Sequence, residues 1–202
     1  MRYRFLIDTY GTERLKVLGT WATFRDEDLP IRPHPTDTRG RSVLEHMVHQ
    51  CVSENLWFRD ILGMDVGASP LPPVESRLGF LRRYAEDSAR RLAALEGRNE
   101  AWWEGDARFF DVIRSRAWVV VRRIAHTAHH RGQQAELLRM LGRDVYSTYG
   151  PTADTGGLFQ HRAPTIYAYP DEGALLAGEA GAGGKPTLPG PGDQPATERP
   201  DR

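Results

Sequence analysis

Apolar residues recur along most of the chain at intervals of three and four, which is the spacing of one face of an α-helix. The charged residues between them, among them Asp87 and Arg91, are expected to face solvent. No two segments show the strict alternation that predicts a pair of β-strands. The pattern therefore predicts an all-α protein, a four-helix bundle, with helices at about residues 3–24, 42–62, 74–95 and 111–141.

Local signals mark several helix ends. Ser42 and Glu45 have the spacing of a capping box, in which the hydroxyl and the carboxylate each accept a bond from an unpaired backbone N–H. Gly142 follows the fourth helix, as is common where a helix ends. The start of that helix is less defined, and Asp111 and Ser115 both remain candidates.

The segments outside these helices differ in character. Residues 98–110 are rich in aromatic side chains and fit neither periodicity, so we expect an irregular loop packed across one end of the bundle. Residues 144–170 have loop composition but carry enough tyrosine and phenylalanine to predict ordered packing on the bundle. The rest is mostly Ala, Gly and Pro and has little to bury. We therefore expect a bundle with an irregular C-terminal extension over residues 1–170 and a disordered tail over residues 171–202.

Composition narrows the classes of function. The 27 basic residues balance the 27 acidic ones, so we expect no nucleic-acid partner. The single cysteine, Cys51, excludes an intrachain disulfide, and its place in an apolar stripe indicates packing and not nucleophilic chemistry. No secretory signal is evident, and no apolar run approaches the roughly 20 residues that cross a bilayer. We therefore expect a soluble, cytoplasmic protein with no membrane partner.

The fourth predicted helix concentrates the histidines. His126 and His130 are four residues apart, so both imidazoles lie on one helical face, where they can bind one divalent cation together. Gln133 shares this otherwise apolar face, and a polar patch there has to be hydrogen-bonded, ligating or open to a cavity. His129 lies on the flank, so His126 with His129 stays an alternative chelate. Arg131 points away and is predicted to lie at the surface or in an interface.

A third ligand has to come from another helix. His46 and His49 on the second helix are the candidates, since the remaining histidines lie in predicted loops. His49 lies in a narrow stripe with apolar neighbours, whereas His46 has mainly polar neighbours, so expected burial favours His49. A hydrogen-bonded core histidine is the ordinary alternative. No glutamate follows His126, so the HExxH pattern is absent and a thermolysin-type hydrolase is disfavoured.

These residues also carry a resemblance to a known family. Residues 126–133, His-Thr-Ala-His-His-Arg-Gly-Gln, resemble the HxxxHRGQ signature of the DinB/YfiT-like superfamily of metal-dependent enzymes. Residues 49–57 resemble its weaker pattern of a histidine followed by an acidic residue and then tryptophan. Residues 149–157 look like the segment that follows the bundle in many members. The resemblance covers about residues 1–160.

The resemblance implies a fold, a site and a chemistry. The fold is a four-helix bundle, commonly a homodimer, with three histidines binding a divalent metal. By position these ligands are His49, His126 and His130. Nickel or zinc is the expected metal, with iron or manganese as alternatives. The implied partner is a small-molecule substrate, and some relatives use bacillithiol, mycothiol or a similar low-molecular-weight thiol in S-transfer or isomerisation.

Three functions follow from such a site. Three neutral histidines leave a coordination position open, as in catalytic metal sites, and a thiol or water bound there becomes more acidic. We favour activation of a low-molecular-weight thiol for S-transfer. The alternatives are a metal-dependent hydrolase that uses bound water, and a non-catalytic dimeric bundle that binds metal or a small ligand. Gln133, next to the site, is expected either to orient bound water or substrate or to make a simple core hydrogen bond.

Overall fold

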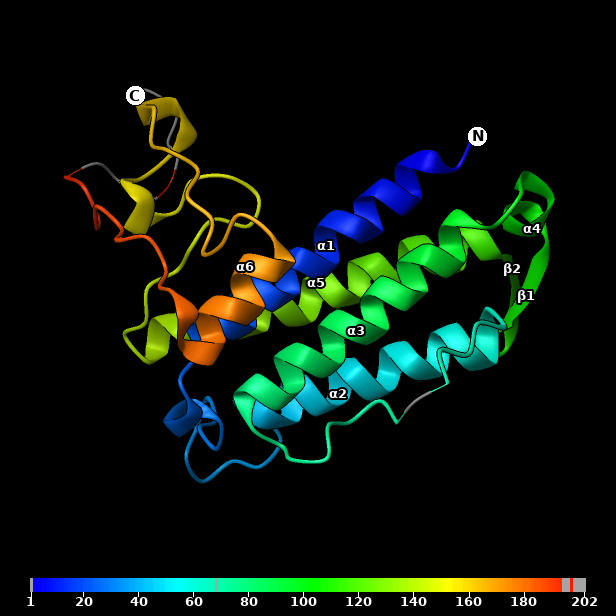
Figure 1. The fold of residues 1–202 in the computed structure, drawn as a ribbon, viewed down its shortest axis with the longest axis horizontal. Helices are drawn as coiled ribbons and strands as arrows, with labels where there is room; N and C mark the ends of the chain where they lie inside the picture. The colour runs from blue at the N-terminus through cyan, green and yellow to red at the C-terminus, as the bar shows by residue number, and fades with distance from the viewer. Residues whose placement is uncertain (1, 68, 194–196, 198–202) are drawn as a thin grey trace.

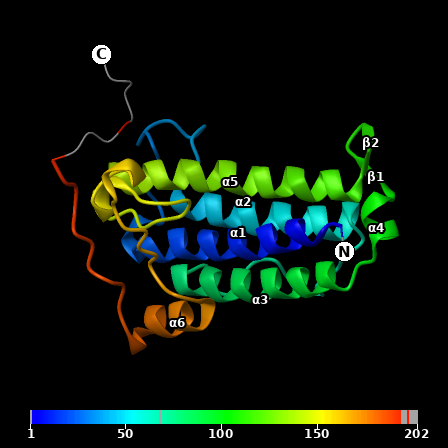
Figure 2. The same ribbon diagram turned by 90° about the horizontal axis from the view of Figure 1, so that it is seen from above.

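Four long helices form the body of the protein, as expected for an all-α bundle. The computed structural model describes residues 2–67, 69–193 and 197. The long helices, which run side by side in Figure 1, are α1 (Arg4–Thr23), α2 (Val43–Leu56), α3 (Arg77–Glu96) and α5 (Arg116–Met140). Each of α1 and α2 contacts both α3 and α5, so the four helices close around a shared interior. Figure 2 shows the same bundle from above.

Apolar side chains from all four helices fill this interior in two clusters. One cluster contains Trp21, Met47, Phe80, Tyr84 and Leu137. The other contains Tyr10, Phe58, Trp103 and Val119. Removing this apolar area from water is the main driving force for assembling the bundle. Because both clusters draw on several helices, the interior fixes how α2 and α5 face each other.

The helix ends follow the local signals in the sequence. Ser42 Oγ accepts a bond from the Glu45 backbone N–H at 3.2 Å, and Glu45 Oε2 accepts one from the Ser42 N–H at 2.8 Å, which confirms the capping box. Helix α2 continues into a π-helical turn, η2 (Trp57–Ile61). At α5, Ser115 Oγ accepts from the backbone N–H of Trp118 at 3.2 Å. Ser115, and not Asp111, is therefore the N-cap of this helix, which begins at Arg116.

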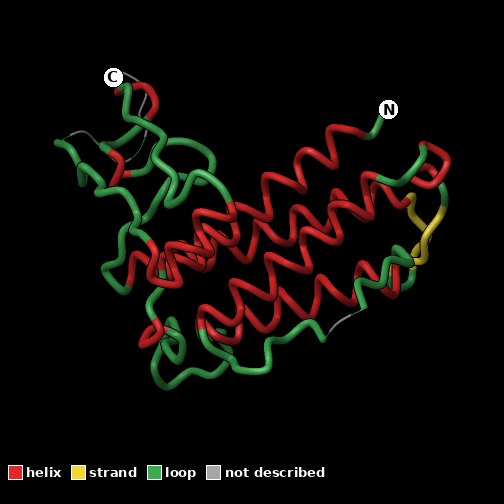
Figure 3. The backbone as a smooth tube through the Cα atoms, viewed as in Figure 1, coloured by secondary structure: helices red, strands yellow, loops and turns green. Residues whose placement is uncertain are grey.

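The connection between α3 and α5 packs across an end of the bundle, but it is not irregular. It contains a short helix, α4 (Glu100–Glu104), and a hairpin of β1 (Asp106–Phe109) and β2 (Val112–Ser115). The strands pair antiparallel, with Asp106 opposite Ser115, and Figure 3 shows them as the yellow segment. Each strand has four residues, which is too short for a clear alternation of apolar and polar positions.

A 3₁₀ turn, η1 (Asp26–Asp28), follows α1. The C-terminal extension contacts α1 through the Tyr149 hydroxyl, which donates to Glu13, and α5 through Asp154 of the 3₁₀ turn η3 (Ala153–Thr155), which pairs with Arg139. A second 3₁₀ turn of the extension, η4 (Phe159–His161), has no buried residue. Beyond it, the expectation of disorder from residue 171 is wrong for the first part of the tail. Helix α6 (Glu172–Ala177) contacts α1 and α3, and the π-helical turn that follows it, η5 (Gly178–Ala182), is joined to α3 by the ion pair of Glu179 with Arg77. Leu175 is only 3% exposed, and Glu172 pairs with Arg14. Residues 194–196 and 198–202 lie outside the described residues.

Several charged residues expected at the surface are buried. Asp87 and Arg91 on α3, and Arg131 on α5, are each at most 2% exposed. Arg131 Nη2 lies 2.7 Å from Glu13 Oε2, and the same nitrogen donates to the Tyr149 hydroxyl. Periodicity misplaced the two arginines because it does not show their partners on other helices, Glu54 for Arg91 and Glu13 for Arg131, which offset the cost of burying a charge. Within the described ranges, no helix combines the length and apolar character needed to traverse a bilayer.

Candidate metal centre

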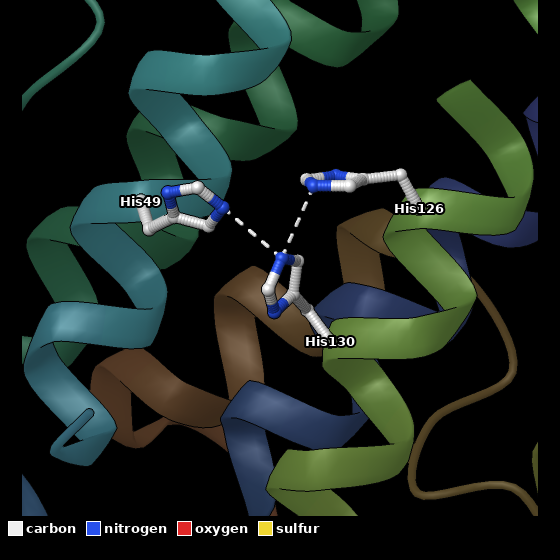
Figure 4. Close-up of side chains that lie close together, drawn as sticks. All are labelled: His49, His126 and His130. Carbon is white, nitrogen blue, oxygen red and sulfur yellow. Dashed lines mark hydrogen bonds between the residues drawn. The ribbon is translucent and has the colours of Figure 1, made fainter. Parts of the chain in front are cut away.

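Three histidines converge between α2 and α5, where His130 is buried and His49 and His126 are half-buried. His49 comes from α2, and His126 and His130 lie one turn apart on α5, with the three rings turned toward one another (Figure 4). His49 Nε2 lies 3.0 Å from His130 Nε2, and His126 Nε2 lies 3.3 Å from the same nitrogen. Their candidate ligating atoms all lie within 4.8 Å of one another. This three-histidine cluster is the arrangement implied by the sequence resemblance.

The protonation pattern of the cluster fits a cation. A neutral imidazole has one N–H and one nitrogen with a lone pair. The amide oxygen of Gln133 lies 2.8 Å from His130 Nδ1, so the proton belongs on Nδ1 and Nε2 presents its lone pair to the cluster. Tetrahedral nitrogen ligands at about 2.05 Å from a zinc ion are about 3.3 Å apart. The two nitrogen separations in this structure are close to that spacing.

The electrostatic surroundings keep the histidines neutral. Burial, reinforced by the charge of Arg41, lowers the pKa of His49 to about 4. Burial, reinforced by the charge of Arg123, lowers the pKa of His126 to about 3. The pKa of His130 is also lowered, chiefly by burial. Because metal binding requires unprotonated imidazoles, the cluster is ready to ligate at neutral pH.

The tryptophan of the helix-two motif supports one of these rings. Trp57 stacks on His126, with ring centroids 5.5 Å apart and planes inclined by 30°. The guanidinium carbon of Arg123 lies 5.3 Å from the centroid of the Trp57 ring. The Trp57 side chain thereby restricts the orientation of His126.

The acidic residue of the same motif lies in a buried polar network. Glu54 is fully buried and accepts a hydrogen bond from the Tyr10 hydroxyl at 2.6 Å. It pairs with Arg91 at 3.4 Å and with Arg123 at 3.8 Å, so it links α2 to α3 and to α5. Sequence reasoning noted Glu54 in the motif but assigned it no role. A signal was present, since Glu54 lies five residues beyond His49, among the apolar residues of a helix.

The other candidate histidines lie outside the cluster. His46 is 4% exposed and its Nδ1 has no partner among the described residues, while His49 is only half-buried. The burial argument that favoured His49 over His46 was therefore wrong, although His49 is the one whose Nε2 meets the other two. His129 is exposed on the flank, with its ring 5.0 Å from that of His130. The direction in which each side chain points, and not how deeply it is buried, therefore determines which histidines form the three-histidine cluster.

The cluster opens into a pocket of about 480 Å³. Its lining residues are Arg41, His49, Arg122, Ala125, His126, His129 and His130. A larger cavity, of about 550 Å³, lies between α1, α5 and the C-terminal extension, and Arg131 and Tyr149 line it. None of the three clustered histidines lines the larger cavity. The smaller pocket is therefore the one that adjoins the candidate metal ligands.

Fold and site together define a helical-bundle protein with a candidate three-histidine metal centre. The chain belongs to the DinB family, whose model matches residues 10–160. The structure is similar to the crystal structure of a DinB-like protein from Bacillus cereus ATCC 10987, with a TM-score of 0.61 and 18% sequence identity. The match covers 71% of this chain and 95% of that one, and at this identity it shows the fold alone. No curated protein matches the chain.

Proposed function

We propose that the protein is a metal-dependent enzyme that activates a low-molecular-weight thiol for S-transfer, with one divalent cation held by His49, His126 and His130. The convergence of their Nε2 atoms at the mouth of a pocket is the observation that carries the proposal. A cation bound there would supply Lewis acidity, which lowers the pKa of a coordinated thiol or water. Nickel or zinc suits an all-imidazole set better than manganese, which prefers oxygen ligands.

The chain's own residues prepare the site. Gln133 holds His130 in the tautomer that presents Nε2, and Gln133 is not among the residues that line the pocket, which supports a role in positioning this histidine over one in contacting substrate. Trp57 covers one face of His126. The pocket volume of about 480 Å³ lies in the range of small-molecule sites, so a substrate fits beside the histidines.

The absence of a carboxylate favours a thiol over water as the nucleophile. No acidic residue lines the described pocket, so no side-chain carboxylate is placed there to take a proton from water. A thiol needs less help, because its ordinary pKa is about 8.5. Cys51 is not that thiol, since it is buried and burial raises its pKa far above the ordinary value. The thiol therefore has to arrive as a substrate.

Metal content tests the first step. Protein purified without a nickel column should carry about one divalent ion per chain, because a single three-histidine centre holds one ion. His130→Ala should lose the ion, whereas the matched variant His129→Ala, one position along α5 and exposed, should keep it. A wild-type protein that carries no metal and binds none when offered would contradict the proposal. Equal loss in both variants would contradict the assigned ligands.

A second assay separates the reactions. Metal-loaded protein should accelerate conjugation of a low-molecular-weight thiol to an electrophile, measured over a panel of thiols and electrophiles. Activity on esters or amides without any thiol would instead support the hydrolase. Metal binding without either activity would support the non-catalytic bundle. A homodimer belongs to the same proposal on family grounds, and light scattering of the purified protein tests it.

A further inference from the structure

The rim of the histidine pocket carries two arginines from different elements. Arg41 directly precedes Ser42, the cap of α2, and Arg122 lies on α5. Both are exposed, and neither forms an ion pair with any residue that the structure describes. They line the same pocket as the three histidines, which also includes His129 and Ala125. The described pocket therefore has two cationic groups and no anionic group in its wall.

The two rim arginines differ in their surroundings from Arg123, which does not line the pocket. Arg123 lies deeper and differs from the rim arginines, because Glu54 and two hydroxyl groups, of Ser53 and Thr127, already contact it. The rim arginines are thus the groups left free to bind a ligand.

We propose that the substrate of this pocket bears a carboxylate, which Arg41 and Arg122 bind at the rim while its reacting atom lies against the histidines. This inference rests on the proposed function, since it places the reaction at His49, His126 and His130. A guanidinium is planar and presents paired N–H donors that match the two oxygens of a carboxylate. A cleft lined by one sign of charge also concentrates ligands of the opposite sign.

The size of the pocket limits the substrate. The arginines and the histidines share one space of about 480 Å³, so the anionic group and the reacting atom belong to one small molecule. A long polyanion is not what this geometry selects, because the two cations stand at one pocket and not along a surface. The chain's overall charge balance agrees with recognition that is local.

Binding of benzoate against its uncharged analogue benzamide tests the inference. The measurement is isothermal titration of the full-length protein, both metal-loaded and metal-free, with metal content determined on the same samples. Benzoate should bind at least about tenfold more tightly than benzamide, because a charge-assisted hydrogen bond is worth that much. Added salt should weaken benzoate binding and leave benzamide binding unchanged. Benzenesulfonate and phenyl phosphate show whether the preference is for a carboxylate.

Substitution of the two rim arginines tests whether they cause the preference for benzoate over benzamide. Arg41→Ala combined with Arg122→Ala should abolish discrimination between benzoate and benzamide. The matched control Arg82→Ala, which removes another exposed arginine without an ion pair to a described residue, should retain it. Equal binding of the two ligands to wild-type protein, or discrimination that survives the double substitution, would overturn the inference. Tighter binding of phenyl phosphate than of benzoate would overturn the choice of carboxylate.

The two proposals fail in different ways. If the protein binds no metal but metal-free protein still prefers benzoate through Arg41 and Arg122, the rim is an anion site and the proposed enzyme is wrong. If metal binds stoichiometrically while benzoate shows no preference, the metal centre stands and the carboxylate inference is overturned. Metal content of the double variant should equal that of wild type, since neither arginine belongs to the cluster.

Discussion

The Nδ1 atom of His130 lies 2.8 Å from the amide oxygen of Gln133, three residues further along the same helix. Residues three apart lie on neighbouring turns of one face, so the helix itself brings these groups together. The bond leaves the opposite nitrogen of the ring free to meet the nitrogens of His49 and His126. A local contact within α5 thereby orients one histidine of the three-histidine cluster, which α2 completes.

Replacing this glutamine should weaken metal binding. Gln133→Leu removes the acceptor that fixes the tautomer of His130, and loss of such a supporting bond typically lowers metal affinity by about 10- to 100-fold. Competition with a chelator of known affinity measures the change. Gln160→Leu, at an exposed position in η4, is the matched control and should bind metal as wild type does. Unchanged affinity in Gln133→Leu would show that the bond has no role in ligation.

The buried network around Glu54 should dominate stability. Glu54→Gln leaves Arg91 and Arg123 buried without their shared carboxylate, and breaking a buried pair costs about 3–5 kcal/mol. The matched change Glu86→Gln removes an exposed carboxylate that pairs with Arg83 and Arg90 on its own helix, and it should cost less than about 1 kcal/mol. Urea unfolding of both variants measures the difference. Similar midpoints would contradict a central role for Glu54.

The metal-free protein should lose stability as the pH falls below neutrality. In the folded state the pKa of His46 is lowered to about 4, as is that of His49, and the pKa of His126 is lowered to about 3. The histidines of the unfolded chain have ordinary pKa values near 6.5, so between about pH 4 and pH 6.5 the unfolded chain binds more protons than the folded one. Stability is therefore fully present above about pH 6.5 and declines toward pH 4. Urea midpoints at pH 7 and pH 5 check this.

Substitution of one histidine isolates that effect. His49→Asn should reduce the difference in urea midpoint between pH 7 and pH 5, whereas the loop variant His34→Asn should not. The carboxylates of Glu13 and Asp28 have pKa values lowered from 4.5 and 3.8, so their contributions are lost only at lower pH. Equal midpoints at pH 7 and pH 5 for the wild type would contradict the expected neutrality of the buried histidines.

Helix α6 should contribute measurably to folding. Leu175→Ala removes a side chain buried in an apolar cluster that α1, α2, α3 and α5 also form, and such truncations cost about 2–5 kcal/mol. Leu56→Ala, at a leucine that is 41% exposed, should cost much less. Thermal or urea unfolding distinguishes the two. Wild-type stability in Leu175→Ala would support the disordered tail that composition alone predicts.

Local and periodic features were readable from the sequence. The stripes predicted the four helices, and Ser42 with Glu45 marked where α2 begins. The spacing of His126 and His130 placed them on one face of α5. These features depend on contacts within a few residues, so the order of amino acids is enough to specify them. The hairpin escaped prediction because strands of four residues are too short to show a period.

Features that bring together two segments distant in the sequence were decided only by the packing of the bundle. The family resemblance named His49, but only the facing of α2 and α5 brings its Nε2 to His130 while His46 lies outside the cluster. The burial of Arg131 likewise follows from Glu13 on α1. Leu175 is buried because an apolar space between helices receives it. In each case a partner far away in the chain changes the free energy of burial, and periodicity carries no record of that partner.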